Sequence, residues 1–233
     1  MLHITDRLHQ LTDEDLHWPF QGQPHYKITS PVPTKYHDAS QYYVDPTPCY
    51  HIHPRDIIRT INHVEDTYPV GFPVHYYLTI HESAGRTNGE KQSINLYEEG
   101  KDGVVGLAPY IMISAKRIPV HPAMLRYVVA HEYGHVVQDW IEWITKDKAK
   151  YPDETKLEQR YAKLRETPCT SDYGALRWHK SIAELIANDF RIVVTNVEPD
   201  FWPHPGFPHP NDMPEIKEFW AEQMQYRAYE VLK

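Results

Sequence analysis

The sequence predicts an α+β protein, and two observations support this expectation. Between residues 74 and 114, three short runs rich in β-branched and aromatic residues alternate with glycine-containing stretches, which is typical of strands joined by turns. On either side of this region, apolar residues recur every three or four positions, which is typical of helices with one buried face. A helix, a small sheet and then several helices in chain order indicate an α+β architecture.

The first helix is expected to begin near Pro54 and to continue to about Asp66. Its apolar residues have the i, i+3, i+4, i+7 spacing of one helical face, and they are Ile57, Ile58, Ile61 and Val64. Three strands are expected after it, at residues 74–80, 93–97 and 109–114. These strands would make up the small sheet of the fold.

The segment after the strands predicts a long helix that begins near Pro122, a residue suited to a first helical turn. Its apolar residues form a broad face, which predicts that this helix is buried. Further helices are expected at residues 153–166, 176–194 and 214–232. The sheet would therefore pack on the long helix, and a helical subdomain would follow.

The 233 residues suit one large domain or a catalytic core with an appended flank. Residues 1–50 are rich in Pro, His and Tyr, and we interpret them as an irregular N-terminal arm. Residues 51–197 are interpreted as the main domain, and residues 198–233 as a proline-rich connection with a C-terminal helix packed on that domain. The sequence thus predicts one functional domain with an elaboration at each end.

Charge and cysteine content exclude several classes of protein. The net charge of -8 argues against a nucleic-acid-binding protein, which would carry a basic patch. Cys49 and Cys169 lie far apart, so they form neither a disulfide framework nor a cysteine metal site. The sequence begins without a basic segment followed by an apolar stretch, and no apolar run is long enough to span a bilayer. We expect a soluble protein without a signal peptide, located in the cytoplasm or in a virus particle.

The segment at residues 128–137 carries the chemistry. His131 and His135 are four residues apart, so on a helix they share one face, about 6 Å apart along the axis. Their ring nitrogens can then reach one zinc ion at about 2.0–2.1 Å each. Glu132 points away from the line between the two ligands, so it can take a proton from a water on the metal. Gly134 has no side chain and allows another element to approach closely.

This His-Glu-x-x-His segment resembles the signature of the zincin metallopeptidases. The resemblance implies a small twisted mixed sheet packed on an active-site helix that carries both histidines. It also implies that an edge strand binds the peptide substrate, and residues 93–97 or 110–114 would supply that strand. The chain lacks the further glycine and third histidine of the metzincins, so it departs from that branch.

A catalytic zinc ion needs three protein ligands and a water, so a third ligand is expected. Glu184 stands among small and apolar residues on a second amphipathic helix, where an uncompensated carboxylate would be costly. This arrangement resembles the gluzincins, in which a glutamate on the following helix completes the site. One turn later those proteins carry an acid that supports a ligating histidine, whereas this chain has Asn188 followed by Asp189. Either of these residues is a candidate for that supporting role.

Residues 170–174 leave two alternatives open. The pattern Ser171-x-Tyr173-Gly174 resembles the toxin-related gluzincins of the anthrax lethal factor type, in which a tyrosine faces the zinc and stabilises the oxyanion. By this resemblance Tyr173 is a catalytic candidate, and a packing role is the alternative. The same segment partly resembles the aspzincins, in which an aspartate is the third ligand, so Asp172 competes with Glu184.

The sequence therefore predicts a zinc-dependent endopeptidase that hydrolyses peptide bonds with zinc-activated water. Its partner would be a peptide or protein substrate, with neither nucleic acid nor membrane involved. The alternative is a catalytically silent zincin-fold protein that serves a structural or interaction role in a larger assembly such as a virus particle. The intact Glu132 argues against that alternative, because a structural zinc site has no use for a base.

Overall fold

The structure, a computed structural model, describes residues 26–27, 41–44, 54–71, 74–79, 88–97, 104–114, 122–145, 156–168, 181–198 and 203–230. The strands are β1 (Tyr26–Lys27), β2 (Gln41–Val44), β3 (His75–Thr79), β4 (Gly89–Tyr97) and β5 (Val104–Ser114). The helices are α2 (Pro54–Thr67), α3 (Pro122–Ile144), α4 (Lys156–Leu164), α5 (Ile182–Val193), the short 3₁₀ helix η2 (Pro210–Asp212) and α6 (Pro214–Glu230). A mixed sheet followed by helices confirms the α+β expectation.

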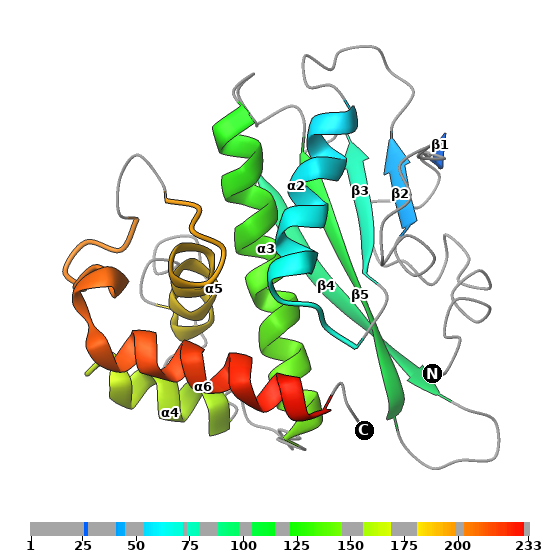
Figure 1. Cartoon of the computed structure of the whole chain (residues 1–233). Coiled ribbons are helices and arrows are strands. Elements are labelled where there is room, and N and C mark those ends of the chain that lie inside the picture. The colour runs from blue at the N-terminus through cyan, green and yellow to red at the C-terminus, as the bar shows by residue number, and fades with distance from the viewer. Residues whose placement is uncertain are drawn as a thin grey trace.

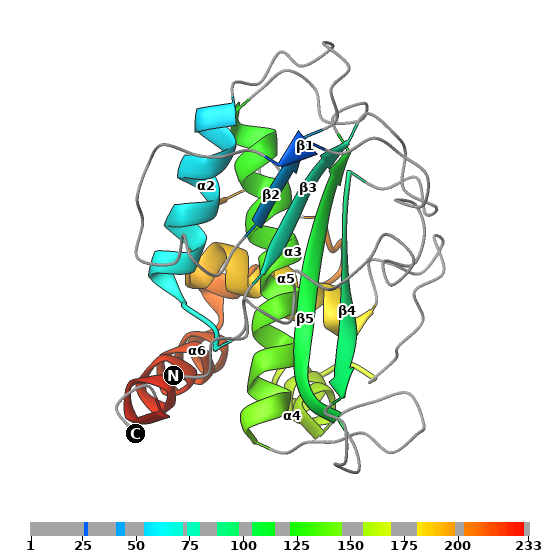
Figure 2. The same cartoon turned by 90° about the vertical axis from the view of Figure 1, so that its right-hand side faces the viewer.

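The strands form one mixed sheet in the order β1-β2-β3-β5-β4. The pairs β2–β3 and β3–β5 are parallel, whereas β1–β2 and β4–β5 are antiparallel. Helices α2 and α3 lie against one face of this sheet (Figures 1 and 2). Within the described residues, β5 is paired on both sides and β4 is paired on one side only. Among the described residues, β4 is therefore an edge strand of the sheet, and it also contacts α3.

The N-terminal arm contributes more order than the sequence predicts. Residues 41–44 form β2, which pairs in parallel with β3 so that Tyr42 lies opposite Tyr76. Residues 26–27 add β1 beyond it. This stretch has no strand-like periodicity of its own. It forms a strand because its backbone N–H and C=O groups pair with those on the edge of β3. The expectation of an arm without regular structure is therefore wrong for these six positions.

Two strands are longer than expected because their pairing continues through polar and glycine-containing sequence. β4 begins at Gly89 rather than at residue 93, and β5 begins at Val104 rather than at residue 109. The two strands pair from Gly89 opposite Ile113 to Tyr97 opposite Val104, with an irregularity after Leu96, so each extension pairs with the expected part of the other strand. Backbone pairing needs no apolar side chain, so the polar residues 89–92 join the sheet although their composition carries little strand signal.

The core lies between the sheet and helices α2 and α3, and it continues between α3 and the later helices. It is built from apolar side chains of the strands and helices, among them Ile61, Val64, Ile111, Ile113, Val129, Val136, Val137, Ile186 and Phe190. The hydroxyl of Tyr133 donates a hydrogen bond of 2.9 Å to the carbonyl of Tyr68, which ties α3 to the end of α2. The helix α3 is therefore central to the molecule, as its broad apolar face predicts.

The later helices form a second layer beside α3. Figure 1 shows α5 nearly end-on beside α3, with α4 and α6 lying along each other below α5, and Figure 2 shows α5 crossing behind α3. Phe219 and Trp220 of α6 pack edge-on against Tyr161 of α4, and Trp220 also contacts Phe190 of α5. The C-terminal helix is thus packed on the helical layer, and the three-part division of the chain stays a prediction. In the part of the chain that the structure describes, no helix has the length and apolar character needed to cross a membrane.

Candidate metal centre

Helix α3 presents two histidines on one face. His131 and His135 are one turn apart, their ring centroids lie 5.0 Å from each other, and their planes cross at 87°. His131 is buried and His135 is partly buried. This is the geometry that the four-residue spacing predicts, because 3.6 residues make one turn.

Helix α5 brings a carboxylate to both imidazoles. Oε2 of Glu184 lies 3.0 Å from Nε2 of His131, and Oε1 lies 3.6 Å from Nε2 of His135. One ligand atom from each of the three residues lies within 4.8 Å of the others. Two imidazole nitrogens and one carboxylate oxygen are a donor set of catalytic zinc sites. This buried group can hold a metal ion.

The helices meet closely because neither has a large side chain at the crossing. A Cβ atom at Gly134 would lie 2.8 Å from the Cα atom of Ala187 and 2.9 Å from its carbonyl oxygen. Both distances are shorter than a van der Waals contact, so only glycine fits here. Glu184 stands one turn before Ala187, and the close crossing therefore sets its distance to the histidines. The expectation that Gly134 admits another element is confirmed.

Burial and mutual charge shift the pKa values of this cluster. Burial alone would raise the pKa of Glu184, but the charge of His135 and hydrogen bonds from both histidines lower it overall. Burial alone would lower the pKa of His135, but the Glu184 carboxylate raises it overall above the ordinary 6.5. The Glu184 carboxylate thus favours the protonated form of His135 in the metal-free protein. A metal cation would compete with protons for these same nitrogens.

Glu132 is buried beside this cluster rather than in it. Its side chain lies under the first residue of β4, where a Cβ atom at Gly89 would stand 2.8 Å from both Cγ and Oε1 of Glu132. Burial raises the pKa of Glu132, and the charges of His131 and His135 oppose this shift. The carboxylate is therefore confined between the motif helix and the edge strand.

A second contact holds β4 against α3. Lys91 forms an ion pair with Asp139, and Oγ of Ser93 donates a hydrogen bond of 2.5 Å to the same carboxylate. Asp139 lies one turn after His135, so β4 is tied to α3 on both sides of the histidines. The edge of the sheet therefore runs alongside the candidate metal ligands.

The two residues expected to support a histidine ligand have other partners. Nδ2 of Asn188 donates to the carbonyl of Glu184 at 2.9 Å and lies 2.7 Å from Nε2 of His204. Asp189 accepts hydrogen bonds from Arg165 and from the hydroxyl of Tyr161. Neither residue contacts His131 or His135, so the expected supporting role is wrong for both. His204 is buried and lies within hydrogen-bond distance of Asn188, and His209 caps η2.

Three residues next to the site have no role predicted from the sequence, and two predicted candidates lie outside the described residues. Gly89 contacts Glu132, and Tyr127 lies one turn before His131 with its ring nearly parallel to that imidazole. Arg191 is buried over the Tyr127 ring. The four-residue spacing of Tyr127 and His131 was a usable signal, whereas the other contacts join distant segments. Tyr173 and Asp172 lie outside the described residues, as do both cysteines.

Comparisons with known proteins add no family to this picture. No family model matches the chain, and neither a curated protein nor a solved structure is similar to it at the level required for a match. The interpretation of the site therefore depends on its residues and their geometry.

Proposed function

We propose that this protein is a zinc-dependent endopeptidase of the zincin type, most similar to the gluzincins. One observation carries the proposal: the Glu184 carboxylate of α5 lies 3.0 and 3.6 Å from the imidazoles of a His-Glu-x-x-His helix. An accidental motif has no reason to have a buried acid from a distant helix aimed at both histidines. Zinc-dependent hydrolysis of a peptide bond requires three protein ligand atoms, here two imidazole nitrogens and one carboxylate oxygen. It also requires a neighbouring carboxylate that does not bind the metal and can act as the base.

In this proposal His131, His135 and Glu184 are the zinc ligands. Bound zinc would lower the pKa of a water molecule and polarise the substrate carbonyl. Glu132 accepts the proton of that water and delivers it to the leaving amine. Its raised pKa suits this double role, because an acid–base group works best when its pKa is near the working pH.

The sheet offers one strand for a peptide substrate. Of the two segments considered, β5 is hydrogen-bonded to β3 and β4, whereas β4 has a free edge among the described residues. A peptide can add to such an edge through backbone hydrogen bonds, with little dependence on its sequence. β4 also lies against α3 at Gly89 and Lys91, on either side of the histidines. We therefore assign β4 as the substrate strand and a peptide or protein as the partner.

Glu184 is favoured over Asp172 as the third ligand because its helix packs directly on α3. A ligand on a helix has a fixed backbone and few rotamers, which suits a rigid metal site. Tyr173 stays the candidate for oxyanion stabilisation, by its resemblance to the lethal factor type. Both Tyr173 and Asp172 are tested by substitution, with zinc content and turnover as the two readouts.

The test begins with the metal and ends with the reaction. The purified chain should bind one equivalent of zinc by elemental analysis and cleave members of a diverse quenched-fluorescence peptide library. Glu132→Gln should keep the zinc and lower kcat by about 10²–10⁴-fold, because an amide cannot accept the proton. Glu142→Gln on the same helix is the matched control and should keep full activity. Cleavage that survives in Glu132→Gln would remove this residue as the base.

The silent alternative has its own outcome in this experiment. A wild-type chain that holds zinc and cleaves none of the peptides would overturn the endopeptidase proposal and favour a structural or interaction role in an assembly. A chain that holds no zinc would overturn the metal site itself.

A further inference from the structure

Arg191 is a buried cation near the candidate metal centre. Its side chain is 0% exposed, and among the residues that the structure describes none of its three guanidinium nitrogens has a hydrogen-bond partner. Burial lowers its pKa to about 10. A buried cation without hydrogen bonds is strongly unfavourable, so its presence calls for a physical reason. The residue stands on α5 two turns after Glu184, near the crossing with α3.

The guanidinium faces an aromatic ring of α3. The guanidinium carbon of Arg191 lies 3.6 Å from the centroid of the Tyr127 ring, which is a close cation–π contact. Such a contact is worth about 2 kcal/mol when the cation is desolvated, which offsets part of the burial cost. The two side chains are therefore held against each other across the same helix crossing that holds Glu184.

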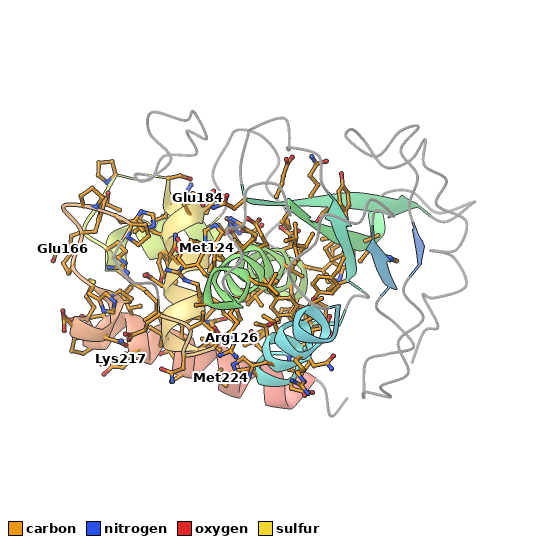
Figure 3. The ribbon with its side chains drawn as sticks, turned by 90° about the horizontal axis from the view of Figure 1, so that it is seen from above. Met124, Arg126, Glu166, Glu184, Lys217 and Met224 are labelled. Carbon is orange, nitrogen blue, oxygen red and sulfur yellow. The ribbon has the colours of Figure 1, made fainter. Side chains whose placement is uncertain are left out.

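The same tyrosine ring contacts a candidate ligand. The rings of Tyr127 and His131 lie 6.4 Å apart between centroids, with only 10° between their planes. Residues four apart on a helix are neighbours on its surface, so this contact is built into α3. Figure 3 looks along α3 and shows α5, with Glu184, passing beside it. Arg191, Tyr127 and His131 thus form a contiguous series that begins on α5 and ends at the metal centre.

A ligating imidazole must keep its plane in one orientation for its nitrogen to point at the metal. In metal sites this task falls to neighbours of the ligand, and their removal typically weakens metal binding about 10–100-fold. Asn188 and Asp189, at the positions expected to do this, contact other groups instead. Tyr127, by contrast, lies nearly parallel to the His131 ring on the same helix.

We propose that Tyr127 is a positioning residue that fixes the imidazole plane of His131 for metal binding, and that Arg191 acts on His131 through the Tyr127 ring. This inference rests on the proposed metal site, and it does not depend on peptidase activity. The ring of Tyr127 is the required part, and its hydroxyl is dispensable. The otherwise costly burial of Arg191 is then explained by the ring that it holds in place.

The first experiment separates the ring from the hydroxyl. Zinc affinity of the full chain is measured by competition with a chromogenic chelator for the wild type, Tyr127→Leu and Tyr127→Phe. Leucine should weaken zinc binding by about tenfold or more, and phenylalanine should restore it to within about twofold. With cobalt(II) in place of zinc, the visible absorption spectrum should change for leucine only, because it reports ligand geometry. Met124→Ala, a half-buried side chain one turn away, is the control for a general loss of packing.

The second experiment tests whether Arg191 acts through the ring. Arg191→Met is made in the wild type and in Tyr127→Leu, and the four zinc affinities form a double-mutant cycle. Direct repulsion between the guanidinium and the metal is the same in both backgrounds and cancels. We expect the effect of Arg191→Met to differ by about fivefold or more between backgrounds. Equal effects, within the roughly twofold scatter of independent sites, would overturn the role of Arg191.

The outcomes distinguish this inference from the proposed function. A wild type without zinc overturns the metal site and everything built on it. A wild type that binds zinc with the same affinity as Tyr127→Leu overturns the positioning role alone. Loss of affinity in Tyr127→Phe that equals the loss in Tyr127→Leu would overturn the assignment of the role to the ring.

Discussion

Helix α5 carries two buried carboxylates, Glu184 and Asp189, little more than one turn apart, and they have different kinds of partner. Asp189 faces α4, where Arg165 pairs with it and the Tyr161 hydroxyl donates to it. Glu184 faces α3, where its neighbours are two imidazoles, which carry a full charge only when protonated. At Asp189 the charge of the carboxylate is balanced by Arg165, which is always protonated. The second site has one carboxylate and two imidazoles, each of which can bind either a proton or a metal ion.

The comparison extends to the whole helix. The face toward α4 continues into apolar and aromatic packing with α6, including Phe190 against Trp220. The face toward α3 carries Glu184, the close contact at Ala187 and the buried Arg191. The side toward α4 thus holds an acid with a permanent cation as its partner, whereas the side toward α3 holds the carboxylate of the candidate metal centre. One helix thus joins a packed structural layer to the candidate metal centre.

The largest expected effect comes from removing the carboxylate on the α3 side. Glu184→Ala should abolish stoichiometric zinc, since it removes one of three protein ligands, a cost of about 3–5 kcal/mol if a zinc-binding free energy of 10–16 kcal/mol is shared equally. Elemental analysis and chelator competition measure this. Zinc retained in Glu184→Ala but lost in Asp172→Ala would move the third ligand to the loop.

The matching change on the α4 side should have the reverse result. Asp189→Ala leaves Arg165 buried without its partner, so the free energy of unfolding should fall by about 3–5 kcal/mol, while the folded fraction keeps its zinc affinity. Urea denaturation measures the stability. Arg160→Ala, which breaks the exposed Arg160–Glu222 pair, is the control and should cost at most about 1 kcal/mol. Zinc loss at full stability in Asp189→Ala would contradict the division between the two faces.

The two glycines next to the site allow a sharper separation of metal binding from catalysis. Gly134→Ala would press on the backbone of Ala187, so α5 must shift, zinc should bind more weakly and stability should fall by about 1–3 kcal/mol. Gly89→Ala would press on the Glu132 side chain and on Cγ1 of Val128. It should therefore keep zinc and lower kcat by up to about 10²-fold.

The readout for the glycine pair is the ratio of zinc affinity to kcat. Gly89→Ala/Val128→Ala relieves the clash with valine only, so it should regain stability without regaining turnover. Recovery of kcat in this double variant would show that Gly89 acts through packing and not through Glu132.

The smallest expected effect is the pH dependence of zinc binding near neutrality. Zinc binds neutral imidazole, and the Glu184 carboxylate raises the pKa of His135 above 6.5 in the metal-free protein. As the pH falls from 8 to 6, protons should therefore displace zinc, and the apparent affinity should fall by up to about tenfold per unit once the imidazole is protonated. Chelator competition across this range checks the slope. Asp189→Asn should leave it unchanged, and a flat profile in the wild type would exclude His135 as a ligand.

Much of the local structure could be predicted from the sequence. The start of α2 at Pro54, of α3 at Pro122 and of α6 at Pro214 agree with the expected positions. Each depends on apolar spacing and on proline in the first turn, which act within a few residues. The pairing of His131 with His135 is likewise a property of one helix. Glu184 was named because a carboxylate among apolar neighbours needs a partner, although its partner was not visible in its own segment.

The contacts between these helices and strands could be seen only in the tertiary structure. The addition of β2 to the sheet, the contact of Gly89 with Glu132 and the pairing of Asp189 with Arg165 each join segments far apart in the chain. The Arg191–Tyr127 contact belongs to the same class. A periodic pattern states which face of a helix is buried, but it does not state which neighbour covers that face or how closely. That distance is set where backbones cross, and here the crossing at Gly134 and Ala187 brings Glu184 to the histidines.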